Sequence, residues 1–324
     1  MSPDARADLS TLTLSVIIVN YRAAHLVCEN MPALLDEVSG FASADIIVVD
    51  NASPGEDRRQ LTGLVAANEQ VRLILAEKNG GFAYGNNRGL EVAEKTDLYF
   101  FLNPDARPRP GALRQMAETL LSREGAGVVG PLLVNEAGEH RASVFNRFEP
   151  LQEYSAGGGV ASGLLRTRPR VAPLATDEVK VADWIPGAAM LVKGEVIELV
   201  GGMDEDYFLY FEETDWLEQI GLAGFCIYAD GGAVVEHIEG VSTGVVGGKV
   251  QRSDLPPYWY QSWRRFWVKN RTRGDTLLAA LLFAAGIATG SIKRRLKKQQ
   301  GGSGPTLKRF VKLCLLPILR GDPL

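Results

Sequence analysis

The chain has 324 residues, of which 46% are hydrophobic and 23% charged, and its formal net charge at pH 7 is −4. This ordinary globular composition fits one large domain plus additions, or two small domains. Its three cysteines, Cys28, Cys226 and Cys314, are far apart and lack metal-finger spacing, which argues against a disulfide framework and favours a reducing compartment.

Four short apolar runs in the first third of the chain each end in polar residues and predict β-strands: TLSVIIVNY (13–21), ADIIVVDNAS (44–53), VRLILAE (71–77) and DLYFFLNPDA (97–106). Stretches of helical length separate or follow them, at 23–38, 57–68, 83–95 and 110–122. Alternating strands and helices with apolar strands predict an α/β fold, in which a mostly parallel central sheet is covered by helices on both faces. Ligands of such a sheet bind beyond the carboxyl ends of its strands.

The pattern weakens after about residue 131. Residues 138–179 show little periodicity and many glycines, prolines and charges, so we expect a loop or lid there. Order returns in 181–202 as a strand followed by a short helix, then in 211–224 as a helix and in 226–240 as one or two strands.

Polar residues at the predicted strand ends are candidate ligands, and each has a plain alternative. Asp105 suits a divalent cation that bridges a diphosphate, but Asn-Pro-Asp is also a common turn. Asp50 can accept from a ribose hydroxyl or a pyrimidine N–H, or it can cap the next helix. The segment KNGGFAYGNNRG (78–89) can bring backbone N–H groups to a phosphate or sugar, or it can be a plain loop. No dinucleotide-binding or P-loop motif occurs.

Three carboxylates crowd together in DYFLYFEETDW (206–216), namely Glu212, Glu213 and Asp215. Such a cluster indicates a solvated helix start, a cation site, or a general base held near a reacting group.

The C-terminal part is basic. From Arg264 onward there are fourteen Lys and Arg residues against Asp275 and Asp322, which leaves this part at about +12 and the preceding part at about −16. Residues 256–274 interleave aromatic and basic residues, 276–292 are uncharged, and 306–321 are amphipathic. An anionic partner is favoured over a merely solvated tail, and a helix lying against the protein or in a headgroup region is favoured over a membrane span.

As a set, seven segments resemble the family 2 inverting glycosyltransferases, especially their rhamnosyltransferase-like branch: SVIIVNY, IIVVDNAS, NGGFAYGNNRG, YFFLNPDA, WIPGAAMLVK, GGMDEDYFLYFEETDW and VVEHIEG. The resemblance spans about residues 13–240 and implies a GT-A fold that binds a nucleotide-diphosphate sugar, dTDP- or UDP-linked, with Mn²⁺ or Mg²⁺.

The resemblance also implies roles for individual residues. Asp105 takes the metal position of the usual Asp-x-Asp motif, in which Asn103 replaces the first acid, and His237 completes the metal site. Glu213 takes the position of the general base, with Glu in place of the usual Asp. The remaining substrate-binding residues that we expect are Asn20, Asp50, Asn51, Asn79, Gly80, Gly81, Asn86, Asn103, Trp184, Gly187, Glu212 and Asp215.

These expectations combine into one organisation of the chain: a disordered N-terminus (1–12), a catalytic domain (13–240) with a nucleotide-sugar half (13–130) and an acceptor half (131–240), and a basic amphipathic extension (241–324). Since the first ten residues contain no apolar signal core, we expect a cytoplasmic enzyme attached peripherally to the inner face of the membrane.

The expected reaction is inverting, metal-dependent transfer of a sugar, rhamnose being one candidate, to a polyprenyl-linked or polysaccharide acceptor in cell-surface glycan synthesis. The alternatives are a catalytically inactive nucleotide-sugar-binding protein and a membrane-surface scaffold. Nucleic acid is not an expected partner, because no RNA-binding motif supports it. Assembly into a homo-oligomer is left open.

Overall fold

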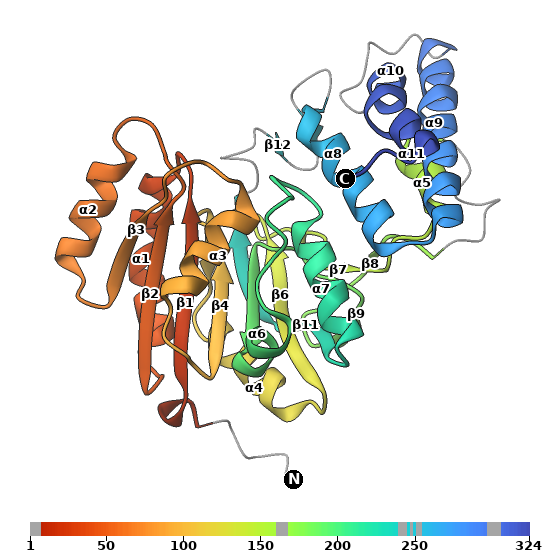
Figure 1. Ribbon diagram of the computed structural model, residues 1–324. Coiled ribbons are helices and arrows are strands. Elements are labelled where there is room, and N and C mark those ends of the chain that lie inside the picture. Colours follow the sequence, from red (N-terminus) through yellow and green to blue (C-terminus); the bar gives the residue numbers. More distant parts are fainter. Residues whose placement is uncertain (1–7, 160–167, 239–244, 247–248, 251–254, 297–305) are drawn as a thin grey trace.

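The protein is built around one large sheet, with a group of helices from the C-terminal part beside it (Figure 1). The computed structural model describes residues 8–159, 168–238, 245–246, 249–250, 255–296 and 306–324.

The central sheet has nine strands in the order β3-β2-β1-β4-β10-β6-β11-β5, and β9 pairs with β11. Their bounds are β1 Thr13–Asn20, β2 Ser43–Asp50, β3 Val71–Leu75, β4 Leu98–Leu102, β5 Ala106–Pro108, β6 Ala126–Val134, β9 Val179–Ala182, β10 Ala189–Lys193 and β11 Cys226–His237. Two small antiparallel pairs lie apart from it: β7 (Val144–Phe145) with β8 (Val171–Ala172), and β12 (Val245–Val246) with β13 (Lys249–Val250).

The sheet is mixed but mostly parallel, as predicted. Strands β3, β2, β1 and β4 form a parallel set, and β6 pairs in parallel with β11. Strand β10 joins these two sets by pairing antiparallel with both β4 and β6, so that β6 and β11 run in the same direction as the first four strands. The carboxyl ends of β1, β2, β4 and β11 therefore lie on the same edge, where the predicted polar residues are found.

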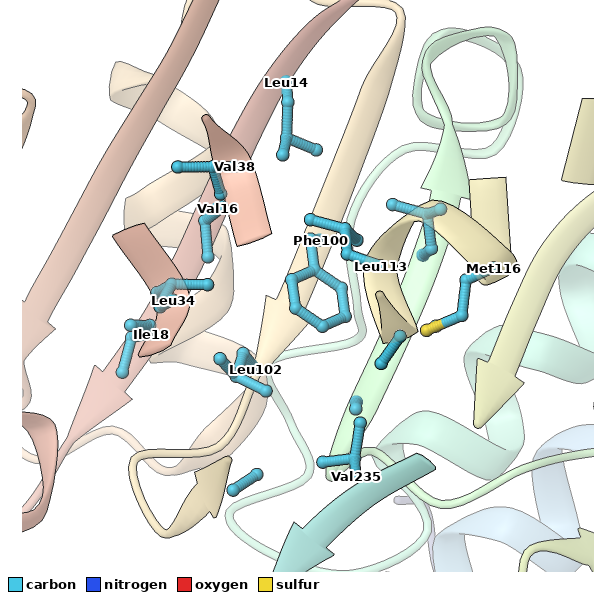
Figure 2. Close-up of a cluster of buried hydrophobic side chains, with 14 of the residues drawn as sticks. Leu14, Val16, Ile18, Leu34, Val38, Phe100, Leu102, Leu113, Met116 and Val235 are labelled. Atoms are coloured by element: carbon cyan, nitrogen blue, oxygen red, sulfur yellow. The ribbon is translucent and has the colours of Figure 1, made fainter. Parts of the chain in front are cut away.

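Helices cover both faces of the sheet. The bounds of those around it are α1 Ala24–Val38, α2 Asp57–Ala67, α3 Phe82–Val92, α4 Ala112–Ser122, α5 Gln152–Ala156, α6 Gly194–Val200 and α7 Glu212–Leu222. Helices α1, α2 and α4 pack on one core and α3, α6 and α7 on the other. Because side chains alternate along a strand, Phe100 points into the first core, among the labelled residues of Figure 2, and Phe101 into the second.

The predicted strands and helices of the first 122 residues are confirmed within a few residues at each end. The expected disorder of residues 1–12 is wrong for 8–12, because Leu9–Thr11 form a 3₁₀ turn and Leu9, only 2% exposed, packs in the first core. Residues 1–7 lie outside the described part. Strand β6 was not predicted, because its Gly and Pro residues are typical of a loop, although every residue of the strand is buried.

The expected loop 138–179 contains the short helix α5, and its residues 160–167 lie outside the described part. Helix α5 packs closely against a C-terminal helix at two glycines. A Cβ at Gly286 would lie 2.1 Å from the carbonyl oxygen of Tyr154, and one at Gly290 would lie 2.6 Å from that of Gly158. The glycines of this apolar stretch therefore allow two backbones to approach each other.

The C-terminal helices are α8 (Pro257–Asn270), α9 (Arg273–Leu296), α10 (Leu307–Phe310) and α11 (Leu316–Arg320), with a π-helical turn at Val311–Leu315. They enclose a third core, to which the part of the chain before them contributes Phe148 and Tyr207. The C-terminal helices and the preceding residues, which the resemblance makes the catalytic part, therefore share a core. The aromatic residues of α8, which the sequence interleaves with basic ones, are for the most part buried in this core: Tyr260, Trp263, Phe266 and Trp267.

Helix α9 is, over Arg273–Lys293, long and apolar enough by length and composition alone to cross a membrane, and 39% of its most apolar window is buried in the protein. The buried core helix of a soluble protein passes the same test.

Candidate active site

A buried network closes the carboxyl ends of β1 and β2. The amide nitrogen Nδ2 of Asn20 donates to Asp50 Oδ1 at 2.9 Å, to Ser53 Oγ at 3.1 Å and to Asp57 Oδ1 at 3.2 Å. Asp50 is only 4% exposed and also accepts from the backbone N–H of Ser53 at 3.4 Å. The network fixes the turn after β2, so Asp50 serves the local structure whether or not it also meets a ligand.

The glycine-rich loop before α3 is tied to this edge. Asn51 Nδ2 donates to Asn79 Oδ1 at 3.1 Å and to the Gly81 carbonyl at 2.9 Å, and Asn51 Oδ1 accepts from the Gly80 N–H at 3.4 Å. Asn86 lies one turn into α3, where its Nδ2 donates to the Phe82 carbonyl at 3.0 Å.

Gly81 is required at its position. Its φ is +93°, and a Cβ there would lie 1.8 Å from the carbonyl oxygen of Phe208, which also accepts the N–H of Phe82 at 3.1 Å. Residue 208 belongs to the segment that carries the crowded carboxylates. The glycine-rich loop 78–81 and the segment 204–215, which we call the acidic loop, are therefore in direct backbone contact.

Asp105 and His237, 132 positions apart in sequence, meet after β4 and at the end of β11. His237 Nε2 lies 3.3 Å from Asp105 Oδ1 and 3.4 Å from Asn103 Nδ2. The pairing of β11 with β5 brings them together, since His237 is opposite Ala106 and the N–H of Ile238 donates to the Asp105 carbonyl at 3.1 Å.

These side chains fit a divalent cation that takes most of its ligands from a substrate. The carboxylate and the amide oxygen suit Mn²⁺ or Mg²⁺, and the imidazole adds a nitrogen ligand of the kind that transition-metal ions bind. Among the described residues, no group of three or more His, Cys, Asp or Glu side chains is arranged to hold a metal ion. Asp105, His237 and the amide oxygen of Asn103 are therefore the protein groups that would hold such a cation.

Glu212 and Glu213 begin α7 in different surroundings. Glu212 is 3% exposed, whereas Glu213 is partly exposed. Burial and the charge of Glu213 raise the pKa of Glu212 well above its ordinary value. Burial also raises the pKa of Glu213, although backbone N–H groups, including that of Gly187, oppose the shift. Within the described part of the chain, Oε2 of each carboxyl has no hydrogen-bond partner.

The segment 184–189 connects Glu213 with the metal-side residues. A Cβ at Gly187 would lie 3.5 Å from Glu213 Cβ and 3.2 Å from a ring carbon of Phe82. The next residue, Ala188, accepts the backbone N–H of Asn103 at 2.8 Å. Two consecutive residues, Gly187 and Ala188, thus contact three parts of the site. Gly187 lies against Glu213 and the start of α3, and Ala188 bonds to the Asn103–Asp105 turn.

Trp184 packs against the third core. Its ring stacks on Phe145 with centroids 4.0 Å apart and on Phe148 at 5.7 Å, and its Nε1 donates to the Asn146 carbonyl at 3.2 Å. These contacts leave Trp184 partly exposed, so it can still border a sugar pocket.

Asp215, which we expected to bind substrate, uses its carboxylate for hydrogen bonds within the protein. Its carboxylate accepts from Lys269 Nζ at 2.7 Å and from Asn270 Nδ2 at 2.5 Å, and it is only 1% exposed. Sequence reasoning missed Lys269 because it counted this lysine with the basic tail. The available signal was the excess of acids at 204–215 beside the excess of cations at 264–271.

A sheet with this strand order, and a polar edge that joins a glycine-rich loop, an Asp–His pair and a carboxylate, define a glycosyltransferase of the GT-A fold. Residues 15–164 match the model of the glycosyl transferase family 2. Over these residues, which are just under half of the chain, the protein is similar to that family.

Its relatives include hexosyl- and rhamnosyltransferases. The low-salt glycan biosynthesis hexosyltransferase Agl10 of Haloferax volcanii is 25% identical over 63% of this chain and 60% of its own length. The N-acetylglucosaminyl-diphospho-decaprenol L-rhamnosyltransferase of Mycobacterium tuberculosis is 24% identical over 71% of this chain and 81% of its own length. The dTDP-rhamnosyl transferase RfbF of Shigella flexneri is 26% identical over 62% and 60%. This chain thus spans less than two thirds of two of these relatives.

Among solved structures, a mannosyltransferase of Pyrobaculum calidifontis in complex with GDP-Man and Mn²⁺ superimposes with a TM-score of 0.59. The alignment covers 92% of this chain and 78% of that protein at 15% identity. At that identity the likeness establishes the fold, and the predicted GT-A architecture is confirmed.

Proposed function

We propose that this protein is an inverting, metal-dependent transferase that moves rhamnose from dTDP-rhamnose to a polyprenyl-linked saccharide. The observation that carries the proposal is the approach of Asp105 and His237 within 3.3 Å, beside the 187–188 segment that Glu213 contacts. The names of the rhamnosyltransferase relatives favour the donor, and the decaprenol named for one of them favours the acceptor. Such a reaction belongs to the synthesis of cell-surface glycans.

The chemistry assigned to the residues is a single displacement. Glu213 takes the proton of the acceptor hydroxyl while that oxygen forms a bond to the anomeric carbon, and the bond from that carbon to the nucleoside diphosphate breaks on the opposite face. The raised pKa of Glu213 makes it a stronger base than an ordinary glutamate.

The leaving diphosphate needs positive charge. Asp105, His237 and the Asn103 amide would hold Mn²⁺ or Mg²⁺, which supplies charge stabilisation to the departing group when bound. Only one of these three side chains is a carboxylate, so the affinity for the metal depends on the donor's diphosphate. A second candidate, a nucleotide-sugar-binding protein without activity, is favoured only by Asn103 and Glu213, which stand where the family usually has aspartates.

A thermal-shift panel tests the donor and the metal together. We expect dTDP-rhamnose to stabilise the protein more than UDP- and GDP-sugars do, and only with Mn²⁺ or Mg²⁺ present. A metal-independent response, or none to any nucleotide sugar, would overturn the proposal. Transfer to N-acetylglucosaminyl-diphospho-polyprenol in detergent micelles then separates an active enzyme from an inactive binding protein.

We also propose that the extension binds the anionic cytoplasmic face of a membrane. The outward residues of α9 lie at helical spacing and, apart from Thr289, are apolar, with Leu278 42%, Leu281 49% and Ile292 57% exposed. Exposed Arg273 and Lys293 flank this stripe. An outward helix face that is apolar and ends in cations suits a headgroup region. The three free cysteines suit a reducing compartment.

The charge available for this contact is smaller than the sequence count implies. Arg265, Lys269 and Arg271 form ion pairs with Asp204, Asp215 and Glu218 of the catalytic part, so they do not face a membrane. Within the described part of the chain, exposed Lys293, Lys308, Lys312 and Arg320 remain.

Vesicle flotation tests the membrane proposal. We expect the protein to float with vesicles that contain phosphatidylglycerol, less with pure phosphatidylcholine, and the double variant Leu278→Asp/Leu281→Asp to stay in solution. Leu222→Asp is the matched control, because Leu222 is 72% exposed on α7. If the double variant floats normally but changes from dimer to monomer in light scattering, the α9 face is an interface between copies and the proposal is wrong.

A further inference from the structure

Helix α8 holds the acidic loop from outside the catalytic part. Lys269 Nζ donates to Asp204 Oδ2 and to Asp215 Oδ2, both at 2.7 Å. One turn earlier, Arg265 lies with its guanidinium against both oxygens of Asp204, at 3.0 to 3.1 Å, and 2.6 Å from Asp206. Arg265 and Lys269 of α8 thus form ion pairs with both ends of the segment 204–215.

The central contacts are buried, so they are not ordinary surface ion pairs. The side chain of Asp215 is 2% exposed, that of Asp204 is 17% and that of Lys269 is 32%. Burial opposes ionisation of Asp204, but hydrogen bonds from Lys269 and Arg265 outweigh it and lower the pKa of Asp204. Breaking a buried pair on one side leaves an uncompensated charge, which is far more disruptive than losing a surface pair.

The loop between these anchors has an unfavourable backbone. Tyr210 and Phe211 have φ values of +72° and +71°, in the left-handed region that bulky side chains rarely adopt. They immediately precede Glu212 and Glu213 and so set the direction in which α7 begins. The Phe211 ring lies among Phe148, Trp259 and Phe266, two of which belong to α8. A strained turn of this kind persists only when its surroundings hold it.

The contacts divide the carboxylates of this segment into two groups. Asp204, Asp206 and Asp215 pair with α8, and Glu205 pairs with Arg88. In the described part of the chain, Glu212 and Glu213 are the two left without a cation. The crowding of the acids therefore has a physical reason: some anchor the loop so that one remains available for chemistry.

We propose that Lys269 and Arg265 are positioning residues of the transferase, which hold the segment 204–215 so that the Glu213 carboxylate stays at the acceptor side of the site. The proposal rests on the proposed role of Glu213 as the base. It assigns to the C-terminal extension a part in catalysis that is separate from any contact with a membrane.

The test compares two lysines that each pair with a carboxylate. Lys269→Met removes the buried anchor, whereas Lys95→Met removes an exposed pair with Glu198 at 2.7 Å, in which the lysine side chain is 79% exposed. In Lys269→Met we expect faster hydrogen exchange of the backbone amides of 204–216 and unchanged exchange of 44–51. We expect kcat for transfer from dTDP-rhamnose to N-acetylglucosaminyl-diphospho-polyprenol to fall on the order of 10²-fold, because a misplaced base costs about that much.

The donor KM is expected to change less than about twofold, since the side chains of Asn20 and Asn51 bond to Asp50 and to the loop 79–81 and not to the segment 204–215. Lys269→Arg, which keeps a cation, should recover part of kcat, and Lys95→Met should match the wild type. Unchanged exchange in 204–216, or a parallel loss of kcat and donor affinity, overturns the proposal.

Two further variants make the result unambiguous. If Lys269→Met does not fold, Asp215→Asn, which leaves Lys269 its bond to Asp204, replaces it under the same expectations. If Glu213→Gln keeps the full rate, the assignment of the base has failed. If Glu213→Gln is inactive but Lys269→Met is normal in exchange and kcat, only the positioning role has failed.

Discussion

The two sides of the site are built in opposite ways. At the donor side, Asn20, Asp50 and Asn51 follow neighbouring strands and bond to one another and to the next loop. At the acceptor side, Glu213 stands on a loop whose anchors come from α8, more than fifty residues away in sequence. The acceptor side thus depends on contacts between residues 54 and 61 positions apart in sequence, whereas the contacts of the parallel-sheet edge join residues 28 to 30 positions apart. The two sides should therefore respond differently to substitution.

The substitution with the largest expected effect separates binding from chemistry. Glu213→Gln keeps the size of the side chain but removes the base, so kcat for transfer should fall by about 10²- to 10⁴-fold. The dTDP-rhamnose affinity, measured by calorimetry with Mn²⁺, should be unchanged, because the substitution keeps the size of the side chain and the hydrogen-bond partners of Asn20, Asp50 and Asn51 do not include Glu213. Glu198→Gln on the exposed face of α6 is the control. A parallel loss of donor affinity would show that the two sides are not independent.

Asp105 and Asn103 lie where the two sides meet. Substitutions at these two positions can either weaken or strengthen the binding of Mn²⁺. Asp105→Asn should weaken Mn²⁺ affinity in the presence of dTDP by at least about 10-fold, since it removes the only carboxylate of the set. Asn103→Asp adds a carboxylate and should strengthen Mn²⁺ binding. Titration calorimetry measures both, with exposed His140→Ala as the control. Equal Mn²⁺ affinity in all variants would place the cation elsewhere.

The contact between the two loops can be broken at one atom. In Gly81→Ala the new methyl group would meet the Phe208 carbonyl at 1.8 Å, and the φ of +93° is itself unfavourable for alanine. We expect a loss of about 3 kcal/mol in the free energy of unfolding, measured with urea. Gly55→Ala is the matched control: its φ is +85°, but nothing lies within 4 Å of the new Cβ, so the loss should be about 1 kcal/mol. Similar losses in both would mean that conformation, and not the contact with Phe208, makes Gly81 necessary.

The difference between the two sides also explains what the sequence could predict. The donor edge follows from local patterns, because apolar runs that end in polar residues indicate strand ends, and parallel strands place those ends together. The meeting of Asp105 with His237 depends on the pairing of β5 with β11, which no local pattern encodes. That meeting was predicted only through the resemblance to a family.

The anchors of the acidic loop were not predicted at all. Arg265 and Lys269 stand in a basic, aromatic segment that also fits a membrane or nucleic-acid surface, and only tertiary packing turns their side chains toward Asp204 and Asp215. Strand β6 was missed for the opposite reason, since its Gly and Pro suggest a loop although every residue of it is buried. Burial and partner choice are properties of the whole fold.

The smallest expected effect concerns Glu212, the buried neighbour of the base. Its pKa is raised in the folded protein by burial and by Glu213, so the folded state binds more protons than the unfolded state, and stability falls as pH rises above the ordinary glutamate pKa. Glu212→Gln should therefore raise the melting temperature at pH 8 and change it little at pH 4. Because Glu212 is 3% exposed whereas Glu213 is partly exposed, we expect the proton that the pair shares to stay on Glu212 while Glu213 ionises. The acidic limb of kcat/KM should then stay in place in Glu212→Gln, and a shift of that limb would show that Glu212 is charged when Glu213 acts.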